Sequence, residues 1–155
     1  MRRRGSAATS PKARAIRLLA RREFGRAELE ERLLAEGFSR SEVRAALDEL
    51  ATLGYLSDAR FARAVAGQKA GRYSRRSIAA ELRAKGVDAQ AVDAALAEAS
   101  IDDAAALSVL WARRFGRAPA DEREKARQVR FLQARGFALS AILKVLRDAA
   151  RGAPR

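Results

Sequence analysis

The sequence of 155 residues has no cysteine and no histidine, and only three prolines, one methionine and one tryptophan. Without cysteine no disulfide can form, which is typical of proteins from a reducing compartment such as the cytoplasm. Without histidine or cysteine there is no Ser-His-Asp or Cys-His catalytic arrangement and no usual zinc site. We therefore expect a cytoplasmic protein that is not an enzyme and holds no cofactor.

Long apolar runs and nucleotide-binding loops are missing too. No segment approaches the roughly 20 apolar residues of a membrane span, and no G-x-x-x-x-G-K-[ST] loop is present. The pairs Asp102 with Asp103 and Asp121 with Glu122 carry side chains of a type that binds metals. Acidic residues at helix starts are ordinary partners of the helix dipole, however. A metal-dependent enzyme is kept only as an alternative, and no metal site is expected.

A fifteen-residue pattern occurs three times in the chain. It reads LLAEGFSRSEVRAAL at 33–47, LRAKGVDAQAVDAAL at 82–96 and LQARGFALSAILKVL at 132–146. The glycines Gly37, Gly86 and Gly136 are separated by 49 and then 50 residues. A period of this size indicates repeated supersecondary units that bury their apolar faces on one another.

Each copy of the pattern predicts a helix that ends at the glycine and a second helix that follows. Glycine adopts the left-handed backbone at a helix C-terminus at little cost, and the next apolar residue can fold back onto the helix. Ser39 with Glu42 spells a capping box and Asp88 is a good N-cap, whereas Ala138 marks the third start poorly. Apolar spacing predicts a further helix before each pair, at about 11–22, 58–70 and 102–116.

The expected fold is therefore all-α: three tandem three-helix repeats, about nine helices, in an elongated and curved array. The predicted parts are a disordered basic arm (1–11), repeat one (12–56), repeat two (57–100), repeat three (101–150) and a tail (151–155). Phe24 lies 13 residues before Gly37, but Phe115 lies 21 residues before Gly136. The third repeat thus carries eight extra residues, and its middle helix, at about 121–135, should be longer.

Charge is the second strong feature, with 32 lysines and arginines against 19 acidic residues and a net charge of +13. A strongly basic chain indicates a polyanion or an acidic protein surface as partner. Residues 12–56 are nearly neutral, with nine basic and eight acidic side chains. Residues 60–85 carry eight basic side chains against Glu81 alone, and residues 112–135 carry eight against three. The basic surface should therefore come from the first two helices of repeats two and three and from the turns that connect them.

The densest basic cluster, Arg72-Tyr73-Ser74-Arg75-Arg76, ends one predicted helix and begins the next. Backbone N–H groups at such a start also favour anions. Tyr73 in this turn is equally suited to stacking on a partner and to packing, whereas Trp111 and Phe115 share an apolar face and should belong to the core.

A sequence-reading helix-turn-helix protein is the obvious rival interpretation. The last helix of such a unit enters the major groove, but the last helix of repeat two carries Asp88, Asp93 and Glu98 and no basic residue. These carboxylates would repel phosphates. A nonspecific nucleic-acid-binding helical-repeat protein, using the same basic surface without a protein partner, stays open as an alternative.

Four segments together resemble the RecX family of regulatory proteins. They are AIRLLARREFGRAELEERLLAEGFS at 15–39, LGYLSDARFARAVA at 53–66, SRRSIAAELRAKGV at 74–87 and EKARQVRFLQARGF at 124–137. They occur in the family's order, and the resemblance extends over nearly the whole chain apart from the arm and the last few residues. One departure is the turn Arg72-Tyr73-Ser74-Arg75, where family members usually have a Gly-Tyr-Gly-Pro-like sequence.

The resemblance implies a modulator of the RecA recombinase that acts without catalysis. Such proteins bind RecA on single-stranded DNA along the filament groove and limit filament growth, ATP hydrolysis, strand exchange and co-protease activity, in DNA repair and the SOS response. We expect a monomer that binds the RecA filament and single-stranded DNA, directly or through RecA. The predicted binding residues are Arg60, Arg63, Lys69, Arg72, Tyr73, Arg75, Arg76, Arg83, Lys85, Arg113, Arg114, Arg117, Lys125, Arg127 and Arg130.

Overall fold

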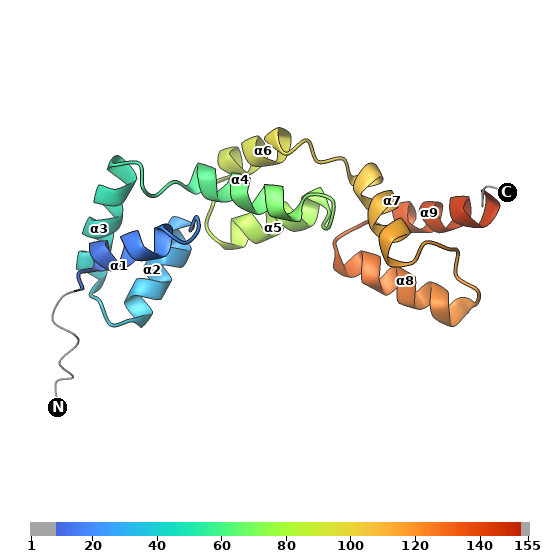
Figure 1. Ribbon diagram of the computed structural model, residues 1–155, viewed down its shortest axis with the longest axis horizontal. Coiled ribbons are helices and arrows are strands. Elements are labelled where there is room, and N and C mark those ends of the chain that lie inside the picture. Colours follow the sequence, from blue (N-terminus) through green and yellow to red (C-terminus); the bar gives the residue numbers. More distant parts are fainter. Residues whose placement is uncertain (1–8, 153–155) are drawn as a thin grey trace, which may run out of the picture.

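The computed structural model describes residues 9–152 and has an all-α architecture (Figure 1). Within this range there are nine helices and no strand. The helices are α1 (Pro11–Leu19), α2 (Arg26–Ala35), α3 (Arg40–Thr52), α4 (Asp58–Lys69), α5 (Arg75–Ala84), α6 (Ala89–Glu98), α7 (Asp103–Arg114), α8 (Glu122–Ala134) and α9 (Leu139–Arg151). None of these helices is long and apolar enough to cross a membrane. Most of the predicted arm and tail lies in residues 1–8 and 153–155, outside the described residues.

The helices form three consecutive three-helix units, α1–α3, α4–α6 and α7–α9, which we call units one, two and three. The units follow one another in an elongated, curved array, with α6 on the outer side of the bend and α5 on the inner side (Figure 1). All the helix pairs in extensive contact lie within one unit. The predicted fold class is therefore confirmed, including the longer middle helix of unit three, since α8 has 13 residues and α2 and α5 have 10 each.

The three repeated glycines end the middle helices as the pattern predicts. Gly37, Gly86 and Gly136 have φ angles of +100°, +80° and +91°. The N–H of the residue after each glycine donates to a carbonyl one turn back, for example Val87 to Leu82 at 3.1 Å. Each middle helix thus closes with a Schellman motif, which satisfies carbonyl groups that would otherwise lack a partner.

The helix starts after these glycines differ in strength, in the predicted order. Ser39 and Glu42 form a capping box at α3, and the Asp88 carboxylate accepts a hydrogen bond from the Ala91 N–H at α6. Ala138 provides no side-chain cap for α9. The start of α9 therefore depends on packing, chiefly of Ile142 and Leu146, which are buried in the core of unit three.

Each unit has its own hydrophobic core. In unit one the fully buried side chains include Leu29, Leu33 and Leu47, and in unit two Ile78 and Leu82. Burying a leucine or isoleucine completely contributes about 1.5–3 kcal/mol to folding. The cores are separate, so the arrangement of the units relative to one another depends on smaller contacts between them.

The same kind of hydrogen bond occurs at both junctions between units. Asp58, the first residue of α4, accepts a hydrogen bond from the Arg26 N–H at the start of α2, at 2.8 Å. Asp103, the first residue of α7, accepts one from the Arg75 N–H at the start of α5, also at 2.8 Å. In both cases a carboxylate from the next unit satisfies an N–H group at a helix N-terminus, where negative charge is favoured.

We expect Asp103→Ala to lower the free energy of unfolding by about 1 kcal/mol, as for loss of a helix cap. The cause is the unpaired Arg75 N–H, so hydrogen exchange at that amide should also become faster. Urea unfolding and exchange measured by NMR test both effects. Asp103→Asn keeps an acceptor oxygen and serves as the control. If Asp103→Ala and Asp103→Asn lowered the free energy of unfolding equally, this hydrogen bond would not hold units two and three together.

Candidate functional site

Basic side chains in the described residues fall into two groups, those paired with carboxylates and those left free. All eleven ion pairs within 4.0 Å in the described range lie in units one and two or between them. Unit three forms no ion pair there, although it holds Arg113, Arg114, Arg117, Arg123, Lys125, Arg127, Arg130, Arg135, Lys144, Arg147 and Arg151. The cationic charge available to a partner is therefore concentrated in unit three.

Four of the predicted binding residues in unit two are engaged within the protein. Arg60 pairs with Glu23 at 2.9 Å and donates to the Gly54 carbonyl at 2.7 Å, so it joins units one and two. Arg63 lies 3.7 Å from Glu98. The remaining two, Lys69 and Lys85, share Glu81.

Glu81 remains charged and neutralises its two lysine neighbours. Burial raises the pKa of its carboxyl, whereas hydrogen bonds and charge from Lys69 and Lys85 lower it, and the net pKa lies below its ordinary value. In unit one a hydrogen bond from Arg14 likewise lowers the pKa of Glu36. Because these carboxylates are ionised near neutral pH, their cationic partners offer less charge to a ligand than the sequence alone indicates.

Arg72, Arg75, Arg76 and Arg83 are exposed, and their guanidinium groups have no carboxylate within 4.0 Å among the described residues. The sequence also predicts that backbone N–H groups at the start of α5 attract an anion. These N–H groups are instead largely occupied from within the protein. The Ser74 N–H donates to the Arg135 carbonyl at 2.9 Å, and the Arg75 N–H donates to Asp103. Any anion at this cluster would thus meet guanidinium groups more than backbone.

Tyr73 is half-buried and packs against the core of unit two. Its ring lies 4.7 Å from the Lys69 ammonium nitrogen and 4.6 Å from the Arg135 guanidinium carbon, as in cation–π contacts. Arg135 belongs to unit three, so this tyrosine contributes to the junction between units two and three. Of the two roles considered for it, these contacts support packing.

The helix α8 carries a row of arginines on one face. Arg123, Arg127 and Arg130 follow one another at spacings of four and three residues, which places them on the same side of an α-helix. Together with Arg117 from the α7–α8 connection they line a hollow of about 530 Å³. We call Arg117, Arg123, Arg127 and Arg130 the arginine face. Arg123 is not among the predicted residues, although its spacing from Arg127 and Arg130 indicates that it shares their face of the helix.

Two carboxylates line the same hollow but do not neutralise the arginines. Asp121 accepts a hydrogen bond from the Glu124 N–H at 2.8 Å, and Glu124 accepts one from the Ala120 N–H at 3.0 Å. Both carboxylates therefore cap the start of α8, and neither lies within 4.0 Å of a basic side-chain nitrogen in residues 9–152. The four exposed guanidinium groups are available for anions such as phosphate or carboxylate, which arginine binds with two parallel hydrogen bonds.

A partly buried chain of hydrogen bonds links α7, α8 and the connection that carries Arg117. The Trp111 indole N–H of α7 donates to the Gln128 side-chain oxygen at 2.9 Å, and the Gln128 amide donates to the Arg117 carbonyl at 3.3 Å. Gln128 is fully buried, and Phe115 packs edge-to-face on Phe131 with centroids 5.5 Å apart. The expectation that Trp111 belongs to the core is thus confirmed, whereas Phe115 is half-buried and contacts Phe131 beside the core.

The remaining predicted residues of unit three differ in their surroundings. Arg113 is exposed, Arg114 lies with its guanidinium carbon 5.0 Å from the Phe131 ring centre, and Lys125 faces a different hollow from the arginine face. Asp102 caps α7 by accepting from the Ala104 and Ala105 N–H groups. Residues 9–152 contain no group of three or more carboxylate, histidine or cysteine side chains placed to hold a metal.

These features define a basic, all-α repeat protein whose exposed, unpaired positive charge in the described residues is carried mostly by arginine. Models of the first, second and third three-helix domains of RecX match residues 12–50, 57–96 and 101–146. The chain is 47% identical over 137 residues to the regulatory protein RecX of Chromobacterium violaceum, covering 88% of this chain and 89% of that protein. It is 42% identical over 135 residues to that of Thermus thermophilus, covering 87% and 89%. The chain belongs to the RecX family.

Solved structures agree with this fold. The crystal structure of RecX from Lactobacillus salivarius superposes with a TM-score of 0.63 at 17% identity, covering 92% of this chain and 96% of that chain. A second crystal structure of a regulatory protein RecX gives a TM-score of 0.64 at 19% identity, covering 89% and 73%. Three three-helix units in tandem are therefore found in other RecX proteins as well.

Proposed function

We propose that this protein is a non-catalytic regulator that binds RecA filaments on single-stranded DNA and inhibits their activity. Inhibition covers filament growth, ATP hydrolysis, strand exchange and co-protease function, so the protein limits homologous recombination and DNA repair and modulates the SOS response in the cytoplasm. Membership in a family of proteins named regulatory protein RecX carries this proposal.

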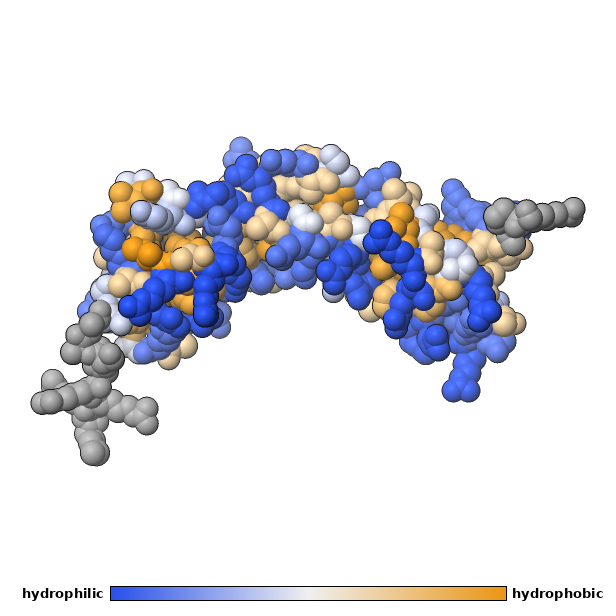
Figure 2. Space-filling view, viewed as in Figure 1, coloured by the Kyte–Doolittle hydropathy of each residue, from blue (hydrophilic) through white to orange (hydrophobic). Residues whose placement is uncertain are grey.

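The shape and charge of the molecule support binding along a filament. The three units form a curved array with hydrophilic side chains over much of its inner side in this view (Figure 2). A curved row of rigid units can contact more than one protomer of a helical filament. Several weak contacts on one frame act at high effective concentration, so together they bind tightly. We propose that the free arginines of units two and three make these contacts.

The arrangement of the charges supports different tasks for the three units. Unit one, whose basic side chains are largely paired with carboxylates, supplies shape more than charge. The arginine face and Arg72, Arg75, Arg76 and Arg83 supply attraction to acidic protein surface or to DNA phosphates. The mechanism is inhibition by occupancy, in which a bound monomer blocks a groove that the filament needs.

A nonspecific nucleic-acid-binding protein would use the same arginines, and one experiment separates the two functions. Affinity for fluorescent oligothymidylate is compared with affinity for the same DNA coated by the cognate RecA with a nonhydrolysable ATP analogue. We expect tighter binding to the coated DNA at physiological salt. Equal or weaker binding to coated DNA, with a steep salt dependence on bare DNA, would favour the alternative.

A further inference from the structure

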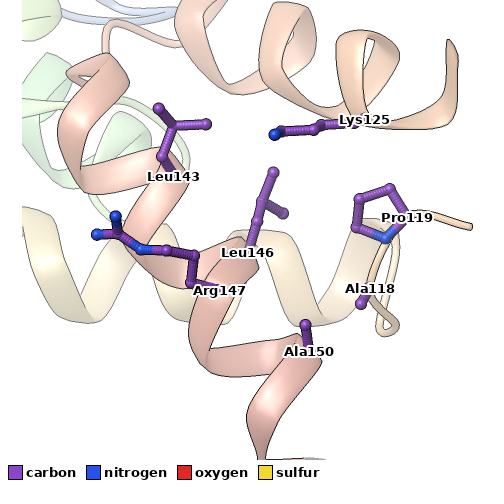
Figure 3. A pocket seen from close by; sticks show the side chains of 7 residues that line it. All are labelled: Ala118, Pro119, Lys125, Leu143, Leu146, Arg147 and Ala150. Atoms are coloured by element: carbon purple, nitrogen blue, oxygen red, sulfur yellow. The ribbon is translucent and has the colours of Figure 1, made fainter. Parts of the chain in front are cut away.

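A second hollow in unit three lies away from the arginine face. It has a volume of about 310 Å³ and lies between the α7–α8 connection, α8 and α9. Five of its seven lining residues are apolar, namely Ala118, Pro119, Leu143, Leu146 and Ala150. The other two are Lys125 on α8 and Arg147 on α9 (Figure 3). We call this feature the apolar hollow.

The extra residues of the third repeat build one wall of the apolar hollow. In unit one α2 begins two residues after Phe24, whereas in unit three α8 begins seven residues after Phe115. The additional segment contains Ala118 and Pro119, and proline fixes φ of the chain at this wall. The insertion seen in the sequence therefore has a structural consequence in unit three, which is an apolar surface facing α9.

Two cations border this apolar surface and no carboxylate lines it. The Lys125 ammonium and the Arg147 guanidinium have no carboxylate within 4.0 Å among the described residues. Figure 3 shows Lys125 reaching over the hollow from α8, with Arg147 on the opposite wall beside Leu143 and Leu146. Lys125 lies about 200° around α8 from Arg123, because an α-helix turns by about 100° per residue. The apolar hollow and the arginine face are therefore separate sites.

We propose that the apolar hollow binds an acidic peptide segment of a partner protein, which inserts an apolar side chain between two carboxylates. The apolar walls match the inserted side chain, and Lys125 and Arg147, on different helices, match one carboxylate each. This inference does not depend on the proposed function.

The charge and lining of the hollow disfavour other occupants. The side chains of the end segments MRRRGSAA and Ala-Pro-Arg carry only basic charges, and a second copy of this chain has a net charge of +13. Lys125 and Arg147 would repel these positive charges. Nucleic acid is disfavoured because binding of single strands relies on aromatic side chains for base stacking, and the hollow is lined by none.

Fluorescence anisotropy of labelled acidic nonapeptides tests the proposal on the full-length protein. The panel has Asp and Glu on both sides of a central pair of Leu, Ile, Val, Met, Phe or Trp, and the control peptide has a central pair of Ser. At least one apolar peptide should bind saturably and the control should not. Ala150→Leu, which fills the hollow from an exposed position, should weaken binding about tenfold or more.

Charge reversal at the hollow is compared with the same change elsewhere on α8. Lys125→Glu with Arg147→Glu should also weaken binding about tenfold or more, while Arg127→Glu with Arg130→Glu should change it less than about twofold. Circular dichroism checks that every variant is folded. Three outcomes would overturn the proposal: no peptide of the panel binds below about 1 mM, the two charge reversals have equal effects, or an oligothymidylate displaces the peptide.

Discussion

Gly136→Ala should lower the free energy of unfolding by about 2–5 kcal/mol, from backbone strain and overpacking together. Gly136 has φ of +91°, where any side chain is strained. A Cβ atom there would lie 2.4 Å from the Ser74 hydroxyl oxygen and 2.6 Å from the Ser77 Cβ. Ser74 cannot move freely, because its hydroxyl accepts the Ser77 N–H and caps α5. The substitution thus strains α8 and forces units two and three apart.

Two other glycines of the repeat provide graded controls. Gly37 has a similar φ of +100°, but a Cβ there would meet nothing within 4 Å, so Gly37→Ala should cost only the strain of about 1–2 kcal/mol. The loss of unfolding free energy for Gly86→Ala should lie between those for Gly37→Ala and Gly136→Ala, since its Cβ would lie 3.0 Å from the Ala27 Cβ. Urea unfolding of the three variants measures this order. Equal losses would show that the junctions between units contribute nothing beyond helix capping.

Reversing the charge of Arg123, Arg127 and Arg130 to glutamate should reduce affinity for single-stranded DNA, and inhibition of RecA, by on the order of 100-fold. Each lost phosphate contact lowers the slope of log affinity against log salt by about 0.7 for single strands, so the slope should fall by about 2. The side chains are exposed, so helix content should not change. Anisotropy at several salt concentrations and RecA ATP hydrolysis provide the two measurements.

Two further triple variants show whether this effect is local. Reversal of Arg72, Arg75 and Arg76 tests the free cluster of unit two and should also weaken both activities. The same charge change at Arg17, Arg21 and Arg40, exposed on unit one, should have several-fold smaller effects. Similar losses in all three variants would mean that net charge, and no particular surface, drives binding. Loss of DNA affinity with full inhibition retained would place the RecA contact elsewhere.

Much of the fold could be predicted because its signals are local. A helix that ends in left-handed backbone favours glycine at that position, as at Gly86. A helix start favours serine or aspartate, whose side chain accepts a hydrogen bond from the backbone, as at Ser39 and Asp88. The extra residues between Phe115 and Gly136 likewise predict a longer α8. Each of these signals acts within a few residues of the chain.

Contacts between units could not be predicted in the same way. Asp58 and Asp103 look like ordinary acidic residues in a first helical turn, yet each caps a helix of the preceding unit. Tyr73 lies in a basic turn, yet its ring meets Arg135, which is 62 positions later in the sequence. Such pairings depend on how the units are oriented, and no short pattern encodes that orientation.

Only part of the candidate site could be predicted, because ion pairing also depends on how the helices pack. Counting charges located the basic regions, but pairing decides which charges are free. Lys85 lies four residues after Glu81, a spacing that predicts an ion pair. The partnership of Lys69 with the same carboxylate depends on the packing of α4 against α5. Arg123 could have been found from its spacing, and the apolar hollow only from the folded chain.

ATP hydrolysis by the cognate RecA on single-stranded DNA, measured as this protein is added, tests the central claim most directly. If the protein occupies the filament groove, hydrolysis should fall in a saturable manner as its concentration rises. The variant with Arg123, Arg127 and Arg130 reversed should require on the order of 100-fold more protein for the same effect. Unchanged hydrolysis at concentrations that saturate DNA binding would contradict the proposed regulation of RecA.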